Sequence, residues 1–504
     1  MKKFSKFLSI AAAIGIFGAS ALSFAGCNDK EDVITLRICN WEEYIDLGAW
    51  DEEERIILKG GEEIFGENAI YDDFTEWFNE THDFKVKVEY STFGTNEDLY
   101  NRLSLGDVYD LVCPSDYMIM KLLAENKVEK YSEDFMKNGE YANCVSPYIN
   151  GIFSQYGWDK YAACYMWGTT GIVYNLEKVD VKDVASWDIL LNEKYKRQVT
   201  VKDNVRDAYF AALGIINHDL LTDPQYDKSN LTELMNATDG ETIAKAEEVL
   251  KKIKNNVYSF ETDSGKADMV TGKVVANYQW SGDAITILDE ADADGTELWY
   301  SVPDECANLW FDGWIMLKDG IDGNADRQTA AEAFVNFLSR PDNAIRNMYY
   351  IGYTSAIAGE TVLKYLNWNY GAEEGADENE IFPYDVSYFF GKDAYISAYR
   401  EEFEFEDEND TVTANRGRQL FAQYPPENVK SRSVVMLDFG DNLTDINQMW
   451  IDVRCLDVTD ISPVVIGIIC GIIGFIAIAS VLYGFRYKLF IKHKPKKGFK
   501  KVEE

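Results

Sequence analysis

The sequence has few histidines and few basic residues for its length. Only His82, His218 and His493 occur among 504 residues, and they lie far apart. Zinc sites and Ser-His-Asp catalysis both draw on histidine, so this scarcity argues against them. The 49 basic residues are outnumbered by 86 acidic ones, which gives a net charge of −37 at pH 7. We therefore do not expect nucleic acid as a partner, because phosphate binding needs a basic surface.

Short catalytic and metal-binding motifs are also missing. The chain has no G-x-S-x-G, Walker-type phosphate loop, H-E-x-x-H or C-x-x-C motif. The stretch Glu290–Gly295 is similar to the start of a calcium loop, but Ser301 stands where a bidentate glutamate is needed. We therefore predict that the protein is not an enzyme and that it holds no metal and no cofactor.

Apolar and aromatic residues are plentiful. They make up 46% and 14% of the chain, respectively, which is enough for a sizeable core and argues against disorder despite the charge. A length of 504 residues exceeds that of one ordinary domain. We therefore expect a folded protein with more than one structural unit.

The N-terminus has the layout of a secretory signal. Three lysines within the first six residues precede the apolar run Phe7–Ala25, and Gly26 and Cys27 follow. Small residues before a cysteine resemble the bacterial lipobox, in which the cysteine is lipidated. We predict a lipoprotein-type signal peptide over residues 1–26 and lipidation of Cys27. A plain signal peptide followed by an incidental cysteine is the alternative.

The C-terminal part of the sequence predicts a membrane anchor. Residues 461–485 carry no charge, and this run is longer than the roughly 20 residues that cross a bilayer as a helix. Residues 486–504 are mainly basic, which places them in the cytoplasm by the positive-inside rule. We expect a transmembrane helix over 461–485, a basic cytoplasmic tail and an extracytoplasmic ectodomain on the cell membrane. A buried core helix is the alternative.

Six cysteines lie between these two end segments. An external location permits disulfides, but the spacing does not define a pairing. We favour isolated buried thiols, without excluding disulfides, for Cys39, Cys113, Cys144, Cys164, Cys306 and Cys455.

The start of the ectodomain alternates between strand and helix patterns. Residues 33–39, 84–90 and 109–113 read as strands, and residues 74–79 and 96–105 read as helices. This β-α-β-α-β order predicts a parallel sheet with helices on its faces.

A second set of elements follows, and two α/β lobes joined by crossing strands would accommodate both sets. Strands are predicted at 171–174, 198–201 and 273–278, and helices at 207–216, 241–254 and 330–338. Three acidic, poorly periodic stretches are predicted as solvated insertions: Asp46–Asn68, Ala372–Glu380 and Glu401–Asp410.

Aromatic residues repeatedly stand beside acids just after predicted strands. The pattern occurs in Asn40–Tyr44, Pro114–Tyr117, Trp280–Asp283 and Trp310–Asp312. Loops at the carboxyl ends of parallel strands are where α/β folds bind ligands. An aromatic face attracts a cation, and a carboxylate adds a charge-assisted hydrogen bond. Together they suit an alkyl ammonium. For any single pair, core packing beside a capping or surface charge is the favoured interpretation, and the repetition of the pattern at strand ends is what favours a cationic ligand.

With these motifs, the chain resembles the spermidine/putrescine-binding proteins of bacterial polyamine ABC importers. The resemblance covers about residues 33–450. It is carried by Asn40–Tyr44, Tyr109–Tyr117, Trp187, Trp280–Ala284, Trp310–Asp312 and Ile351–Tyr353. It implies a two-lobed α/β fold of the periplasmic-binding-protein type (type II), with a hinge between the lobes. We expect one lobe from 33–166 and 312–360, and the other from 167–311 and 361–455.

The resemblance also implies a binding site between the lobes. Its rings would be Trp41, Trp280 and Trp310, surrounded by Tyr44, Tyr117 and Tyr353. Ser115 would be a polar contact, and ammonium groups would meet Glu43, Asp207, Asp283 and Asp312. Asn204 stands where spermidine-binding members have an aspartate, and Asp283 matches an acid of putrescine-binding members, so the preferred polyamine stays open.

The function that this resemblance implies is capture of a polyamine and its delivery to the permease subunits of an ABC importer. Three alternatives remain at this point. They are a binding protein of the same fold for another small ligand, a surface-tethered glycosidase that uses paired carboxylates, and a sensor that signals across the membrane.

Overall fold

The computed structural model describes most of the chain: residues 33–400, 402–407, 410–415, 418–455, 467 and 471–483. The predicted signal peptide, the lipidation site Cys27 and the predicted tail at 486–504 lie outside the described residues.

The first lobe is built on a parallel sheet. Strand β1 (Val33–Trp41) lies between β4 (Lys85–Phe93) and β5 (Leu111–Val112), and both pairings are parallel. Helices α1 (Ile70–Thr81) and α2 (Asn96–Leu105) connect the strands, which confirms the predicted β-α-β-α-β order. Helix α1 forms because its apolar residues recur every four positions and are buried on one face, at Ile70, Phe74 and Phe78.

The second lobe contains a further set of strands. Strand β8 (Val199–Lys202) pairs in parallel with β9 (Ser259–Glu261) and with β10 (Ala276–Trp280). Strand β11 (Leu298–Ser301) pairs antiparallel with β7 (Ala162–Asn175). The strands predicted at 198–201 and 273–278 are confirmed with shifts of one to three residues, whereas the strand predicted at 171–174 is only the last part of the longer strand β7.

Helices α8 (Val205–Ile216) and α11 (Gly240–Asn256) belong to the second lobe and were both predicted. The side chain of Asp239 caps α11 by accepting hydrogen bonds from the backbone of Glu241 and Thr242. Further helices among the described residues are α3 (Asp116–Ala124), α6 (Pro147–Tyr156), α13 (Ser281–Ala293), α15 (Ala325–Leu338), α16 (Pro341–Ile351), α17 (Glu360–Tyr370) and α21 (Leu443–Arg454).

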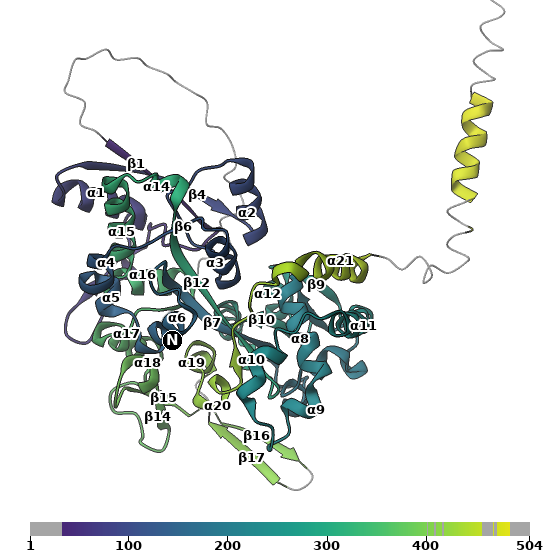
Figure 1. Ribbon diagram of the computed structural model, residues 1–504. Helices are drawn as coiled ribbons and strands as arrows, with labels where there is room; N and C mark the ends of the chain where they lie inside the picture. Colours follow the sequence, from purple (N-terminus) through teal and green to yellow (C-terminus); the bar gives the residue numbers. More distant parts are fainter. Residues whose placement is uncertain are drawn as a thin grey trace, which may run out of the picture. The chain divides into compact units, whose positions relative to one another are not determined.

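Two long strands join the lobes. Strands β7 and β12 (Ala307–Leu317) lie in the middle of the order β4-β1-β5-β12-β7-β10-β8-β9, as Figure 1 shows. Strand β7 pairs with β12 over residues 162–169 and with β10 over 170–174. Both long strands are buried throughout. The predicted two-lobed α/β architecture with crossing strands therefore matches the sheet.

Residues after α17 contribute to the cores of both lobes. Tyr384 in β14 (Ile381–Asp385) and Ile396 in β15 (Tyr395–Tyr399) join the hydrophobic cluster that contains β1. Phe421 in α19 (Arg418–Gln423) packs instead in the cluster that contains α13. The lobe boundaries that the sequence suggested stay a prediction.

The stretch Asp46–Asn68 is not the solvated insertion that its acidity predicted. It sends four buried apolar side chains into the core of the first lobe: Trp50, Ile56, Leu58 and Ile64. Asp46 is also buried and forms an ion pair of 2.7 Å with Arg346. The prediction was wrong because these apolar residues lie on short irregular segments, where burial follows neither a helical nor a strand period.

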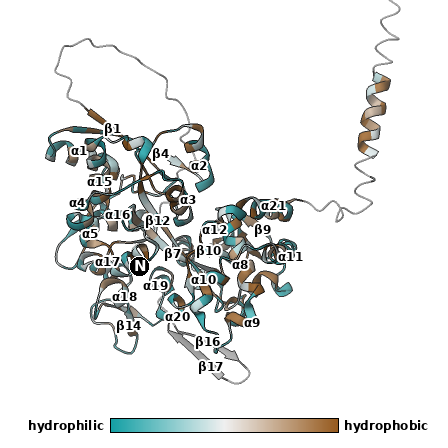
Figure 2. Cartoon of the chain, in the orientation of Figure 1, coloured by the Kyte–Doolittle hydropathy of each residue, from teal (hydrophilic) through white to brown (hydrophobic). Residues whose placement is uncertain are grey.

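The expected transmembrane helix at 461–485 is corrected by the structure. No helix in the described part of the chain is both long enough and apolar enough to cross a membrane. The continuous helical stretch described here is residues 471–483, which Figure 2 colours largely brown for hydrophobic residues. The predicted localisation as a single-spanning protein is wrong on the same ground.

Four of the six cysteines are buried thiols that form no disulfide: Cys39, Cys113, Cys164 and Cys306. This agrees with the favoured interpretation of the cysteine spacing for these four positions. Burial raises the pKa of the Cys113 and Cys164 thiols well above the ordinary value, so both are protonated, apolar core groups at neutral pH.

Candidate functional site

Asp312 is a buried acid on β12. Its two carboxylate oxygens accept hydrogen bonds of 2.7 Å, one from the Tyr44 hydroxyl and one from Ser115 Oγ. Burial raises the pKa of Asp312 to about 6, and these two hydrogen bonds act in the opposite direction. Within the part of the chain that the structure describes, no basic side chain lies within ion-pair distance of this carboxylate. Hydroxyl groups alone therefore satisfy its charge.

Aromatic rings from separate segments meet beside Asp312. Tyr353, which follows α16, has its ring centroid 5.6 Å from Trp310 and 5.3 Å from Tyr44. The Trp310 indole is held in place because its Nε1 donates to the Thr169 carbonyl at 3.2 Å. Three predicted rings and one predicted acid thus lie together around β12.

Tyr353 also connects the two lobes. Its ring packs in the hydrophobic cluster of the first lobe, and its hydroxyl donates to Asp283 Oδ1 of α13 at 2.9 Å. It lies directly against Gly282, where an added Cβ would come within 2.1 Å of the ring. The approach of the two lobes at this point therefore requires a residue without a side chain.

Asp283 lies in the first turn of α13, where the helix dipole favours a negative charge. Its Oδ2 lies 3.5 Å from Lys202 Nζ, and its Oδ1 lies 3.4 Å from Lys266 Nζ. Lys202 ends β8, and Lys266 belongs to the short helix α12 (Ser264–Val270). The sequence analysis missed both lysines, because neither stands in the aromatic and acidic pattern that was used to find the site.

Trp280 and Asp207 form a second contact in the same lobe. The Trp280 Nε1 donates to Asp207 Oδ2 at 3.1 Å, and Lys202 Nζ lies 4.1 Å from the centre of the indole ring. Burial raises the pKa of Asp207 to about 6, while the charge of Lys202 acts in the opposite direction. The Trp280 ring is thereby fixed at its edge by an acid and on one face by an ammonium.

Tyr117 takes part in a contact that the sequence did not predict. The Arg206 guanidinium lies 3.6 Å from the centre of its ring, and the Tyr117 hydroxyl donates to Glu97 Oε1 at 3.0 Å. Arg206 itself donates to the Leu437 carbonyl at 2.7 Å. The contact links α3 of the first lobe with α8 of the second, because Arg206 precedes Asp207 in the first turn of α8.

Two predicted residues lie at the margin of this network. Trp41 ends β1 and packs against Phe93 with ring centroids 4.7 Å apart. Its buried Nε1 has no hydrogen-bond partner among the described residues. Glu43 is exposed, and its negative charge acts on the Lys266 ammonium. The structure does not join Trp41 to the rings around Asp312 through any ring contact within the described residues.

Some of the motifs lie just after a strand, as expected, and one lies inside a strand. Ser115 follows β5, and Trp280 and Asp283 lie where β10 ends and α13 begins, as the sequence predicted. Trp310 and Asp312 instead lie inside β12, next to a register shift in its pairing with β7. The shift is a β-bulge, a feature that re-aims side chains near sites.

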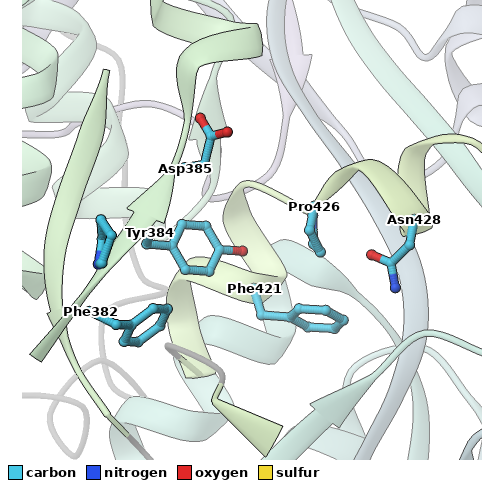
Figure 3. Close-up of a pocket in the computed structure, with 7 residues that line it drawn as sticks. Phe382, Tyr384, Asp385, Phe421, Pro426 and Asn428 are labelled. Atoms are coloured by element: carbon cyan, nitrogen blue, oxygen red, sulfur yellow. The ribbon is translucent and has the colours of Figure 1, made fainter. Parts of the chain in front are cut away.

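A surface pocket lies elsewhere and contains none of the predicted site residues. It is drawn in Figure 3 and is lined by Phe382, Pro383, Tyr384, Asp385, Phe421, Pro426 and Asn428. Its one acid, Asp385, already accepts hydrogen bonds from the backbone and hydroxyl of Ser387. The chemistry that the motifs predict is therefore concentrated around Asp312 and Asp283.

Comparison with known proteins identifies the family. Residues 71–361 match the family described as bacterial extracellular solute-binding protein, which is more than half of the chain. The chain belongs to this family. A spermidine/putrescine-binding periplasmic protein of Escherichia coli is 28% identical over 386 residues, which cover 76% of this chain and 91% of that protein. A putrescine-binding periplasmic protein of the same organism is 27% identical over 288 residues, 55% of this chain and 73% of that protein.

Solved structures agree with the fold of a solute-binding protein. The spermidine/putrescine ABC transporter substrate-binding protein PotD of Streptococcus pneumoniae has a TM-score of 0.53 at 22% identity, covering 83% of this chain and 98% of that one. The TpPotD lipoprotein of Treponema pallidum has a TM-score of 0.55 at 18% identity, covering 84% and 99%. The likeness confirms the predicted two-lobed periplasmic-binding-protein fold.

Proposed function

We propose that this solute-binding protein captures a polyamine outside the cytoplasm and delivers it to the permease of an ABC importer. The observation that carries the proposal is Asp312, a buried carboxylate whose partners are two hydroxyl groups and which lies among aromatic rings. A buried carboxylate without a cation is costly, and an alkyl ammonium would supply the missing charge.

Ring geometry supports the same ligand. The centroid of the Tyr353 ring lies 5.6 Å from that of Trp310 and 5.3 Å from that of Tyr44. Aromatic faces cover methylene groups and attract cations by about 0.5–2 kcal/mol each. A chain of methylenes with ammonium ends would fit between the rings and place one end on Asp312.

The mechanism is binding without chemistry. The lobes meet at Tyr353 and Asp283, so a ligand that spans both lobes would favour the closed form by its differential affinity for it. The strongly acidic chain would also attract polycations over long range, in a salt-dependent way. The closed, loaded protein would then dock on the permease and release the polyamine.

The names of the relatives support this function, since several are spermidine/putrescine- or putrescine-binding proteins. Under this proposal the chain is not an enzyme, and the acids at the site bind charge without transferring protons. The anchoring at Cys27 stays a prediction from the sequence.

The proposal is tested by titrating the purified ectodomain with ligands in a calorimeter. Putrescine, spermidine and spermine are compared with calcium and with simple sugars. We expect at least one polyamine to bind with micromolar or better affinity, which corresponds to about −8 kcal/mol, and the sugars and calcium not to bind. Heat from sugars alone, or from none of the polyamines, would contradict the proposal.

A further inference from the structure

Lys202 places a buried ammonium inside the proposed site. Its side chain is 1% exposed, and its Nζ donates to the Thr262 carbonyl at 2.7 Å. The same Nζ lies 3.5 Å from Asp283 Oδ2 and 4.1 Å from the centre of the Trp280 ring. One carboxylate and one indole face therefore already hold a cation that belongs to the protein.

These contacts are the ones that a ligand ammonium would make. An amine held by a carboxylate and an aromatic face is the arrangement that the sequence predicted for a bound polyamine. Lys202 supplies it from the end of β8, without any ligand. One cation position of the site is thus occupied internally.

Asp312 and Asp207 differ from Asp283 in this respect. In the part of the chain covered by the structure, neither has a basic group within ion-pair distance, whereas Asp283 has Lys202 at 3.5 Å and Lys266 at 3.4 Å. Asp312 is hydrogen-bonded to hydroxyls and Asp207 to the Trp280 indole. Asp207 feels the charges of Lys202 and Arg206 only at longer range, so Asp312 and Asp207 are the carboxylates that remain for direct ion pairs with a ligand.

We propose that Lys202 is a specificity-determining residue that takes the place of one ligand ammonium, so that the site prefers an unbranched diamine to a triamine. This inference rests on the proposed polyamine-binding function. The two ammonium groups of the diamine pair with Asp312 and Asp207. A third ammonium at Asp283 would have to displace the buried Lys202 from the carboxylate with which it forms its ion pair among the described residues, which leaves a poorly compensated buried charge.

Lys266 plays a smaller part. Its side chain is 33% exposed, and it also contacts Asp263 at 3.8 Å. Because it can turn towards solvent, a ligand displaces it at a lower cost than it displaces Lys202. The preference for a diamine is therefore assigned to Lys202.

The first test compares putrescine with spermidine by calorimetry in the wild type and in Lys202→Met. We expect the wild type to bind putrescine at least tenfold more tightly than spermidine. Loss of the ammonium frees Asp283, so Lys202→Met should shift the ratio of the two dissociation constants towards spermidine by at least tenfold. A ratio that stays within twofold of the wild type would overturn the inference.

Lys273→Met is the matched control. Lys273 also pairs with an acid and covers a ring, at 2.9 Å from Asp268 Oδ1 and 4.7 Å from the Tyr258 ring centre. None of these three residues belongs to the proposed site. We expect this variant to keep the wild-type ratio, which separates the role of Lys202 from the general effect of removing a lysine.

A double variant covers the case in which Lys202→Met alone does not fold. Lys202→Met with Asp283→Asn removes both members of the ion pair and keeps the net charge of the site. We expect the ratio of its two dissociation constants to stay within threefold of the wild-type ratio, because the variant leaves no carboxylate at position 283 for a third ammonium. A shift of the ratio towards spermidine by tenfold or more would mean that the third ammonium does not depend on Asp283, and the inference would be wrong.

The outcomes separate the inference from the function on which it rests. A wild type that binds neither polyamine contradicts the proposed function and with it the inference. A wild type that binds polyamines with a preference for spermidine keeps the function and overturns the inference alone. Circular dichroism and thermal melting of each variant show that the binding data refer to folded protein.

Discussion

Asp312 and Asp283 are both buried acids of the proposed site, but their surroundings are opposite. Asp312 lies inside a long strand and accepts hydrogen bonds from two hydroxyl groups. Asp283 begins a helix, accepts one hydroxyl and lies beside two lysine ammonium groups. The charge of Asp312 is thus available to a ligand, whereas the charge of Asp283 is already compensated by lysines of the protein.

The difference teaches that an acid near an aromatic ring is not by itself a cation site. The charge available to a ligand depends on which basic groups the fold brings close, and these come from other elements. Lys202 reaches Asp283 from a neighbouring strand, and its arrival decides what that carboxylate can bind. Changes at these acids and at the rings beside them, and a change of pH, test the contrast between Asp312 and Asp283.

The largest effect is expected for Asp312→Asn. Asparagine keeps the shape and can still accept one of the two hydroxyl hydrogen bonds, while its amide nitrogen can only donate, and it removes the charge that a ligand ammonium would meet. A charge-assisted hydrogen bond contributes about 1.5–3 kcal/mol, so polyamine affinity should fall by about 100-fold in calorimetry. Asp385→Asn is a suitable control because Asp385 is exposed and lies outside the proposed site. Asp110→Asn is not suitable, because the buried Asp110 carboxylate is hydrogen-bonded to Arg37. Wild-type affinity in Asp312→Asn would remove this acid from the site.

Acidification should weaken binding by at least tenfold. Burial raises the pKa values of Asp312 and Asp207 to about 6, so both carboxyls are mainly charged at pH 7.5 and mainly neutral at pH 5. When the pH of the solution is one unit below the pKa of a carboxyl group, about 90% of that group is protonated. This lowers affinity about tenfold for each acid that must be charged. Calorimetry at the two pH values measures this. An affinity independent of pH would show that neither carboxyl is needed in its charged form.

Removal of the Trp310 ring should reduce affinity by about tenfold. Trp310→Ala deletes one aromatic wall beside Asp312 and leaves the acid and its hydroxyl partners in place. A cation–π contact in a desolvated site contributes about 2 kcal/mol, and part of this is regained by rearrangement of the other rings. Calorimetry on this variant is paired with melting curves, because the ring is also part of the core. An unchanged affinity in folded protein would exclude Trp310 as a ligand contact.

The smallest effect is expected for Tyr353→Phe. This change keeps the ring between Trp310 and Tyr44 and deletes only the hydroxyl that donates to Asp283. Because Asp283 keeps both lysine partners when it loses this hydroxyl donor, we expect about a threefold loss of affinity. A loss near that of Asp312→Asn would mean that Asp283 depends on its hydroxyl partner more than on its lysines.

Local patterns in the sequence were enough to predict much of the fold. The apolar period of α1 and the alternation of β4 identified both elements, and the order of strands and helices predicted parallel pairing in the first lobe. The buried residues of Asp46–Asn68 were missed because irregular segments have no period. The transmembrane helix expected at 461–485 was judged by composition alone, and no helix among the described residues is long and apolar enough to cross a membrane.

The site was predictable in part. Aromatic and acidic neighbours pointed to Trp280, Asp283, Trp310 and Asp312, and the structure joins these through Tyr353 and Lys202. Lys202 could not be found in this way because its partner is 81 positions further along the chain. Lys202 lies near Asp283 because β8 pairs with β10 in the folded sheet, and the local sequence does not show this pairing.

The contact of Tyr353 with Gly282 has a practical consequence. Because the tyrosine ring fills the space where a Cβ would stand, even an alanine at position 282 would collide with the ring and push the two lobes apart. Gly282→Ala should therefore favour the open form of the protein while every charged group of the proposed site stays intact. Such a variant would offer a way to study the unloaded form of the protein without altering the side chains of the proposed site.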